Sequence, residues 1–132
     1  MFWNKSTAPP QKNTRKVGAH YEDLALEYLK KQKLKLFKRN FNGLRGEIDL
    51  IMWDDKTLVF VEVRYRKSKQ HGHPSETVQY HKKTRLIKTA ELFLCKHFPR
   101  SFPACRFDIV AIYRDFQQNL QYDWMKNAFE LR

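Results

Sequence analysis

One stretch of the chain, residues 45–66, predicts an antiparallel hairpin and constrains the fold more than any other. Two apolar runs, Ile48–Trp53 and Leu58–Tyr65, have the composition of β-strands, and a polar turn, Asp54–Thr57, joins them. If the turn holds an even number of residues, Asp49 of the first strand lies opposite Glu62 of the second. Opposed residues have their Cβ atoms about 4.5–5.5 Å apart, so these two carboxylates repel each other unless a proton or a cation lies between them.

The same register places Glu47 opposite Arg64, whereas an odd turn would send the two acids to opposite faces. Apolar residues occupy both faces of the hairpin. One face is expected to hold Ile48, Leu50, Met52, Val59, Val61 and Val63, and the acid-bearing face also holds Ile51, Trp53, Leu58 and Phe60. A hairpin that is apolar on both faces predicts a sheet that helices cover on both sides.

The remaining segments predict a single domain built on this sheet. Apolar periodicity and turn residues predict helices at about residues 17–33 and 77–97, strands at 34–41, 105–113 and 120–125, a basic loop at 64–75 and a terminal anchor at 127–129. This order predicts an α/β domain at residues 17–132, with a central mixed sheet flanked by helices on both faces. Residues 1–16 are expected to form a flexible basic tail.

The charge of the chain predicts a polyanionic partner. Lys and Arg number 26 against 14 Asp and Glu, which gives a net charge of +12. Such a balance attracts nucleic acid, although solubility alone or an anionic membrane surface would also account for it. No apolar run is long enough to cross a membrane, the first residues lack a signal-peptide pattern, and two cysteines are too few for a disulfide framework or a zinc site. A reduced cytoplasmic protein is expected.

Three acids can converge on one point: Glu22 from the first helix, and Asp49 and Glu62 from the hairpin. Hard divalent cations such as Mg²⁺ or Mn²⁺ bind carboxylates, and an ion held by Asp49 and Glu62 would remove their repulsion and stabilise charge on a scissile phosphate. Arg64 follows Glu62 on the same strand face and could contact that phosphate. The alternative is a structural ion network that pairs the acids with one of three arginines, Arg45, Arg64 and Arg66.

Basic side chains that could contact phosphates cluster in two places. The loop after the hairpin carries Arg66, Lys67 and Lys69, and the start of the second helix carries Lys82, Lys83, Arg85 and Lys88. Positive charge near a helix start opposes the helix dipole, and an anionic partner would offset that cost. The alternative is an ordinary solvated face. Asp108 is expected to give structural support by pairing with Arg106 or Arg45.

Several ordered motifs closely resemble the YraN-type bacterial family. They are Gly18-x-x-x-Glu22-x-x-Ala25, Gly46–Ile51, Val59–Arg64, Lys82 before Leu86 and Ala90, Cys105–Asp108 and Asn127–Phe129. The resemblance runs from about Lys16 to Phe129. This family, known as an uncharacterised protein family, is itself similar to the PD-(D/E)xK restriction-endonuclease-like superfamily, whose relatives include archaeal Holliday-junction resolvases.

The resemblance implies a nuclease fold and Mg²⁺-dependent hydrolysis of phosphodiester bonds in branched or otherwise structured DNA. It makes Asp49 and Glu62 metal ligands and Glu22 an accessory acid. Arg64 stands where the superfamily usually has Lys, which can lose its proton and orient a water, whereas Arg stays charged. Lys82 of the facing helix could supply the amine instead. Resolvases usually act as dimers, so a homodimer is one option by analogy, and the sequence leaves the oligomeric state open. A nucleic-acid-binding module that keeps the fold without cleaving is the alternative.

Overall fold

The computed structural model describes residues 14–44, 46–66 and 80–129. These residues form two helices and five strands, in the order α1 (Thr14–Lys31), β1 (Lys35–Asn42), β2 (Glu47–Asp54), β3 (Thr57–Arg66), α2 (Tyr80–His97), β4 (Cys105–Arg114) and β5 (Leu120–Phe129). The strands form one sheet in the order β1-β2-β3-β4-β5. Only the β3–β4 pair is parallel, and the connection between these two strands carries α2. The predicted α/β architecture with a mixed sheet is confirmed.

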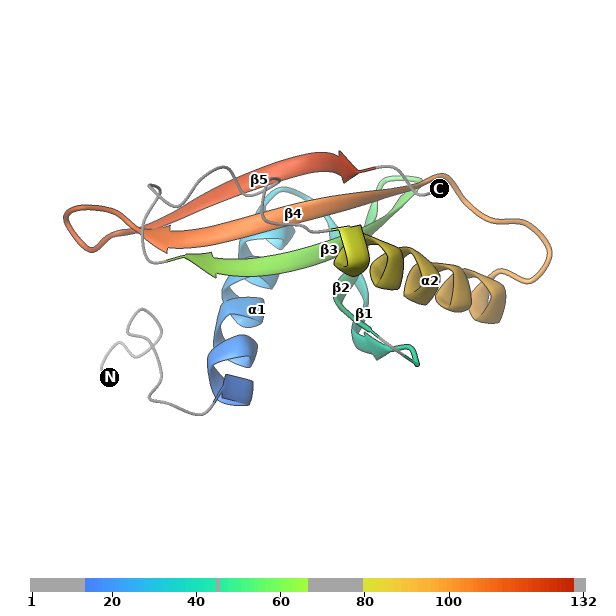
Figure 1. Cartoon of the computed structure of the whole chain (residues 1–132). Coiled ribbons are helices and arrows are strands. Elements are labelled where there is room, and N and C mark those ends of the chain that lie inside the picture. The colour runs from blue at the N-terminus through green and yellow to red at the C-terminus, as the bar shows by residue number, and fades with distance from the viewer. Residues whose placement is uncertain (1–13, 45, 67–79, 130–132) are drawn as a thin grey trace.

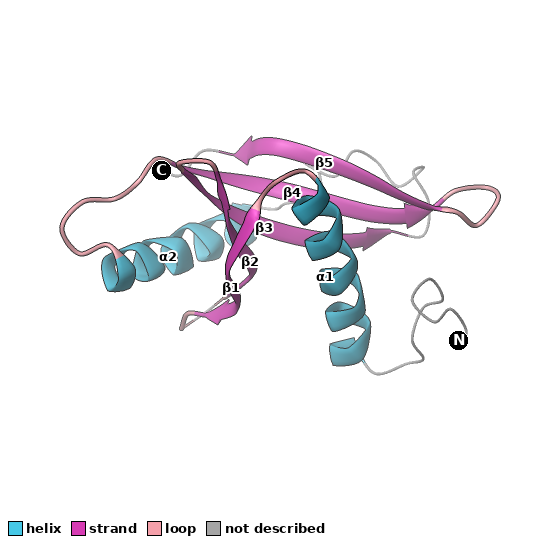
Figure 2. Cartoon of the chain, turned by 180° about the vertical axis from the view of Figure 1, so that it is seen from behind, coloured by secondary structure: helices cyan, strands magenta, loops and turns pink. Residues whose placement is uncertain are grey.

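The two helices cover opposite faces of the sheet, as predicted. Figures 1 and 2 show α1 and α2 on either side of the β1–β2 hairpin. Under α2, the core contains Phe93, Phe60 and Phe107, all almost fully buried. Under α1, it contains Leu29 together with Leu50 and Val59 from the hairpin. Each strand residue in these clusters removes apolar surface from water, and burial of a large aliphatic or aromatic side chain contributes about 1.5–3 kcal/mol.

The β2–β3 hairpin has the register that an even turn predicts. Its ladder runs from Asp54 paired with Thr57 to Leu50 paired with Val61. Asp55, in the turn, has a φ of 55°, a left-handed conformation that Asp adopts at low cost. The turn length therefore sets the strand pairing, and the pairing carries Asp49 to the end of the ladder beside Glu62.

The predicted alternation of the hairpin fails at one residue. Ile48 packs in the cluster under α2, whereas Leu50 packs in the cluster under α1. Strict alternation would place both on the same face, so the prediction for Ile48 was wrong. The break lies at Asp49, where β2 leaves its ladder with β3 and the strands begin to separate.

Some predicted boundaries also need correction. Helix α1 begins at Thr14, so residues 14–16 belong to it rather than to the tail. Arg64–Arg66 continue β3 rather than opening a loop, because their backbone pairs with β4 as far as Tyr113. Strand β5 runs to Phe129 rather than ending at Met125. The expected tail at residues 1–13, the basic loop from residue 67 and the first residues of the second helix lie outside the described ranges. Among the residues that the structure describes, no helix is long and apolar enough to cross a membrane.

Candidate functional site

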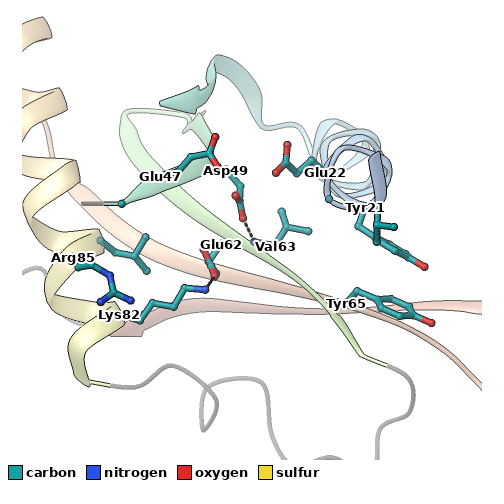
Figure 3. A pocket seen from close by; sticks show the side chains of 13 residues that line it. Tyr21, Glu22, Glu47, Asp49, Glu62, Val63, Tyr65, Lys82 and Arg85 are labelled. Carbon is teal, nitrogen blue, oxygen red and sulfur yellow. Dashed lines mark hydrogen bonds and ion pairs between the residues drawn. The ribbon is translucent and has the colours of Figure 1, made fainter. Parts of the chain in front are cut away.

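A cavity of about 500 Å³ opens where β2 and β3 separate, between the two helices. Four carboxylates line it: Glu22 from α1, Glu47 and Asp49 from β2, and Glu62 from β3. Figure 3 shows these acids facing a common space, with Lys82 and Arg85 entering from α2. The three acids that the sequence singled out are therefore brought together. Glu47, which the sequence placed opposite Arg64, also belongs to this group.

Asp49 lies at the centre of the acids and has little to compensate its charge. Its Oδ2 accepts a hydrogen bond of 2.8 Å from the backbone N–H of Val63. The carboxylate thus accepts a hydrogen bond from β3 just beyond the last backbone pair of β2 and β3, Leu50 with Val61. Burial and the charges of Glu62, Glu22 and Glu47 raise the pKa of Asp49 to about 8, against the lowering effect of the Val63 N–H. An aspartate with this pKa holds a proton near neutrality or requires a cation.

Glu62 is buried, and two cations contact it. The ammonium of Lys82 lies 2.5 Å from Oε2 of Glu62, and Nη2 of Arg64 lies 3.7 Å from the same atom. Lys82 comes from the facing helix, so the site contains an amine although the strand position carries Arg64. Within the described chain, Nε and Nη2 of Arg64 are buried without a hydrogen-bond partner. Arg64 itself is not among the residues that line the cavity.

Glu22 reaches from α1 to the sheet, as the sequence allowed. Its Oε1 accepts a hydrogen bond of 2.8 Å from Nδ2 of Asn40 and lies 3.6 Å from Nη2 of Arg39. Asn40 has a φ of 51°, so the backbone of β1 is left-handed at the residue whose side chain contacts Glu22 of α1. These contacts orient Glu22 at the wall of the cavity, close enough to raise the pKa of Asp49.

Comparison with known proteins places this arrangement in a family. Residues 21–112 match the family described as Uncharacterised protein family UPF0102. A UPF0102 protein of Vibrio cholerae is 50% identical over 117 residues, which cover 88% of this chain and 93% of the relative. The chain belongs to the UPF0102 family. UPF0102 proteins of Coxiella burnetii and Alcanivorax borkumensis are 48% and 40% identical, over 89% and 92% of this chain and 95% and 97% of the relatives.

The family assignment confirms the YraN-type resemblance. The UPF0102 match begins at Tyr21 and ends at Ile112, so it spans Glu22, the complete β2–β3 hairpin and Lys82. Every residue that the sequence proposed for the catalytic group therefore lies inside the matched region. The names of these relatives assign no activity.

The donor set of this UPF0102 chain fits a hard divalent cation. The acids offer only oxygen ligands, and the raised pKa of Asp49 reflects repulsion that a cation would relieve. Among the described residues, no three His, Cys, Asp or Glu side chains form a ready-made metal cluster. Mg²⁺ commonly uses only one or two protein carboxylates and keeps several waters, so Asp49 and Glu62 are the residues that would hold it.

The predicted phosphate-contacting residues fall into four groups. Arg85 lines the cavity, whereas the ammonium of Lys83 lies over the ring of Phe129, 5.7 Å from its centroid. Arg66 is buried and its Nη2 has no hydrogen-bond partner in the described chain. Lys67 and Lys69 lie outside the described residues. The cationic side chains that α2 contributes to the cavity wall are therefore Lys82 and Arg85.

A second acidic centre, around Asp108, was only partly predicted. Arg106 pairs with Asp108 as expected, with Nε 3.0 Å from Oδ1, and it also reaches Asp54 at 2.8 Å. Two further donors were missed: Nε1 of Trp124 and the backbone N–H of Asn127, each 2.9 Å from the Asp108 carboxylate. An acid inside an otherwise apolar strand was the available signal, but it did not identify these partners.

Proposed function

We propose that this UPF0102 protein is a divalent-cation-dependent endonuclease-like phosphodiesterase that acts on structured or branched DNA. The observation that carries the proposal is the convergence of four carboxylates with Lys82 and Arg85 in one cavity of a +12 protein. Carboxylates that repel one another suit a hard cation, and cations beside them suit the phosphates of a polyanion. The likeness of the family to PD-(D/E)xK nucleases agrees with this reading.

Each residue has a role that follows from its position. Asp49 and Glu62 would hold Mg²⁺ or Mn²⁺, which supplies Lewis acidity toward a phosphate oxygen. Glu22, fixed by Asn40, maintains the negative field that makes the cation necessary. Lys82, at the cavity wall, can move its ammonium from Glu62 to a phosphate oxygen once Glu62 engages a cation. Arg85, on the next turn of α2, can contact a neighbouring phosphate.

A second candidate function is a nucleic-acid-binding module that does not cleave. The observation that favours it is the pairing of Glu62 with both Lys82 and Arg64, which already neutralises one of the two proposed ligands. Arg64 also remains charged at any ordinary pH, so it cannot act as a general base. In this function the same cavity binds the sugar–phosphate backbone without hydrolysis.

Incubation with DNA separates the two functions. Duplex and four-way-junction DNA are incubated with the full chain and Mn²⁺, beside Asp49→Ala and the matched control Asp55→Asn in the exposed β2–β3 turn. The endonuclease proposal expects cleavage that Asp49→Ala reduces by about two orders of magnitude or more, because an electrostatic stabiliser of the transition state is lost. Asp55→Asn should cleave like the parent.

Salt-sensitive binding of both DNAs without cleavage would instead support the binding module. Cleavage that persists in Asp49→Ala would place the chemistry elsewhere or reveal a contaminating nuclease. The melting temperature of each variant is measured in parallel, so that a loss of activity through unfolding is recognised.

A further inference from the structure

A second hollow of about 600 Å³ lies directly beside the acidic cavity, along α2. Gly43 and Leu44, which follow β1, form one wall, and α2 forms the other. The helix contributes His81, Thr84, Arg85, Lys88, Thr89 and Leu92. Arg85 lines both the hollow and the acidic cavity. The two spaces therefore adjoin at one guanidinium.

The charge of the second hollow is opposite to that of the first. The described residues that line it include the cations Arg85 and Lys88 and the imidazole of His81, and none of these described residues carries a carboxylate. The acidic cavity, in contrast, is lined by four carboxylates. The first space suits a cation and the second suits an anion, and an anionic chain could pass from one to the other.

Apolar surface borders the cations of the second hollow. Leu44 is 99% exposed and Leu92 is 47% exposed. An inorganic anion would leave both side chains in water. A nucleotide offers a phosphate to Lys88 and the apolar faces of its sugar and base to the leucines, so it matches both parts of the surface.

The two walls of the hollow approach each other closely at Gly43 and Gly46. A Cβ on Gly43 would lie 2.8 Å from Oγ1 of Thr89, and one on Gly46 would lie 3.1 Å from the same atom. At Gly43 the chain therefore lies so close to α2 that a larger residue would force Thr89 to shift. Thr89 is fixed in turn, because its hydroxyl donates a hydrogen bond of 2.8 Å to the carbonyl oxygen of Arg85.

We infer that the second hollow binds the segment of a polynucleotide that flanks the phosphate in the acidic cavity. This inference rests on the proposed function and names the substrate as a polymer, not a mononucleotide or a phosphomonoester. The helix rises about 15 Å from Lys82 to Leu92, which corresponds to about four nucleotides at 3.4 Å for each nucleotide of a stacked strand. Arg85 and Lys88 contact the phosphates of this flank.

Binding of short oligodeoxynucleotides tests the inference. The full chain carries Asp49→Asn, so that the oligonucleotide is not cleaved. The asparagine keeps an oxygen that can accept the Val63 N–H. The buffer contains Mg²⁺. Fluorescence anisotropy follows a labelled dinucleotide, tetranucleotide, hexanucleotide and octanucleotide. Affinity should rise about tenfold between the dinucleotide and the hexanucleotide and then level off, because the two cations of the hollow become engaged.

Two double variants in the Asp49→Asn background show which residues cause the gain in affinity with oligonucleotide length. Arg85→Ala with Lys88→Ala should remove the gain with length. Lys30→Ala with Lys56→Ala removes the same charge from exposed positions on α1 and in the β2–β3 turn, and should keep the gain. An equal loss in both double variants, or an unchanged gain in the first, would overturn the inference.

Further outcomes separate failure of the inference from failure of the proposed function. If oligonucleotides bind but their affinity does not depend on length, the hollow is not a flank site and the proposed function stands. If no oligonucleotide binds any variant, and four-way-junction DNA binds neither these variants nor the parent chain, the proposed function itself fails. An oligoglutamate peptide that binds as tightly as the hexanucleotide would show that the hollow selects only negative charge, and would overturn the assignment to nucleic acid.

Discussion

Two aspartates of this chain, Asp108 and Asp49, have opposite surroundings. Asp108, fully buried in β4, accepts hydrogen bonds from Arg106, from the indole of Trp124 and from the backbone of Asn127. Asp49, at the end of the β2–β3 ladder, accepts one N–H from Val63 and is surrounded by carboxylates. The first carboxylate is paired with Arg106 and accepts further hydrogen bonds, whereas the second has one donor, and its neighbours raise its pKa to about 8.

The difference separates a structural acid from a candidate functional one. A buried carboxylate that is paired and fully hydrogen-bonded holds the elements around it together. Asp108 does this for β4, β5 and the end of β2, which Arg106 reaches through Asp54. A carboxylate held among like charges destabilises the folded chain by itself, and a ligand that supplies positive charge relieves that cost.

The largest expected effect comes from Asp108→Ala. The substitution leaves the donors of Trp124 and Asn127 unpaired and removes one of the two partners of Arg106. Breaking such a buried pair costs about 3–5 kcal/mol, measured as the free energy of unfolding in urea. Asp49→Ala should cost much less in metal-free buffer. If the two substitutions cost the same, Asp49 belongs to a structural ion network and the metal site is wrong.

A smaller effect is expected in the pH dependence of stability without metal. Below the unfolded pKa of 3.8, Asp49 is protonated in both states and costs nothing. Between 3.8 and about 8 the folded chain retains a proton that the unfolded chain releases, so stability falls as the pH rises. Relative to the parent, Asp49→Asn should gain on the order of 2 kcal/mol between pH 4 and pH 8.

Chemical denaturation at a series of pH values in chelating buffer measures that gain. Asp55→Asn, in the exposed turn, is the matched control and should follow the parent throughout. A parallel profile for the parent and Asp49→Asn would contradict the raised pKa of Asp49.

The smallest effect is the stabilisation that a divalent cation gives. At a concentration ten times its Kd, Mg²⁺ or Mn²⁺ adds about 1.4 kcal/mol to the free energy of unfolding. For a chain of this size that raises the melting temperature by about 3–6 °C. The shift should appear for the parent and be absent for Asp49→Asn, at equal ionic strength. Equal shifts in both proteins would show that the cation binds elsewhere.

The hairpin and its acids were predictable because local rules govern them. A turn of even length fixes the pairing of Leu50 with Val61, and this pairing brings Asp49 beside Glu62. The alternation rule then fails at Ile48, because the side chain of Asp49, rather than its backbone, takes the N–H of Val63. Sequence patterns predict hydrogen bonds between the backbones of two strands. They do not predict a side chain that replaces a backbone carbonyl as the acceptor.

The surroundings of Asp108 and the second hollow were not predictable, because they depend on register and packing between distant segments. Between Ile109 paired with Met125 and Phe107 paired with Phe129, the register of β4 and β5 shifts. This irregularity, with Asn127 at a φ of 55°, brings its N–H to Asp108. Nothing in the local sequence of Leu44 indicates that it lines a hollow together with α2.

Gly43 allows the β1–β2 connection to lie close to α2. It has a hydrogen atom where any other residue has a Cβ, and that Cβ would lie 2.8 Å from Oγ1 of Thr89 on the helix that also carries Lys82. Relatives that keep the acids but carry a larger residue at this position would hold their helix farther from the β1–β2 connection. They would accommodate a wider ligand with the same chemical groups.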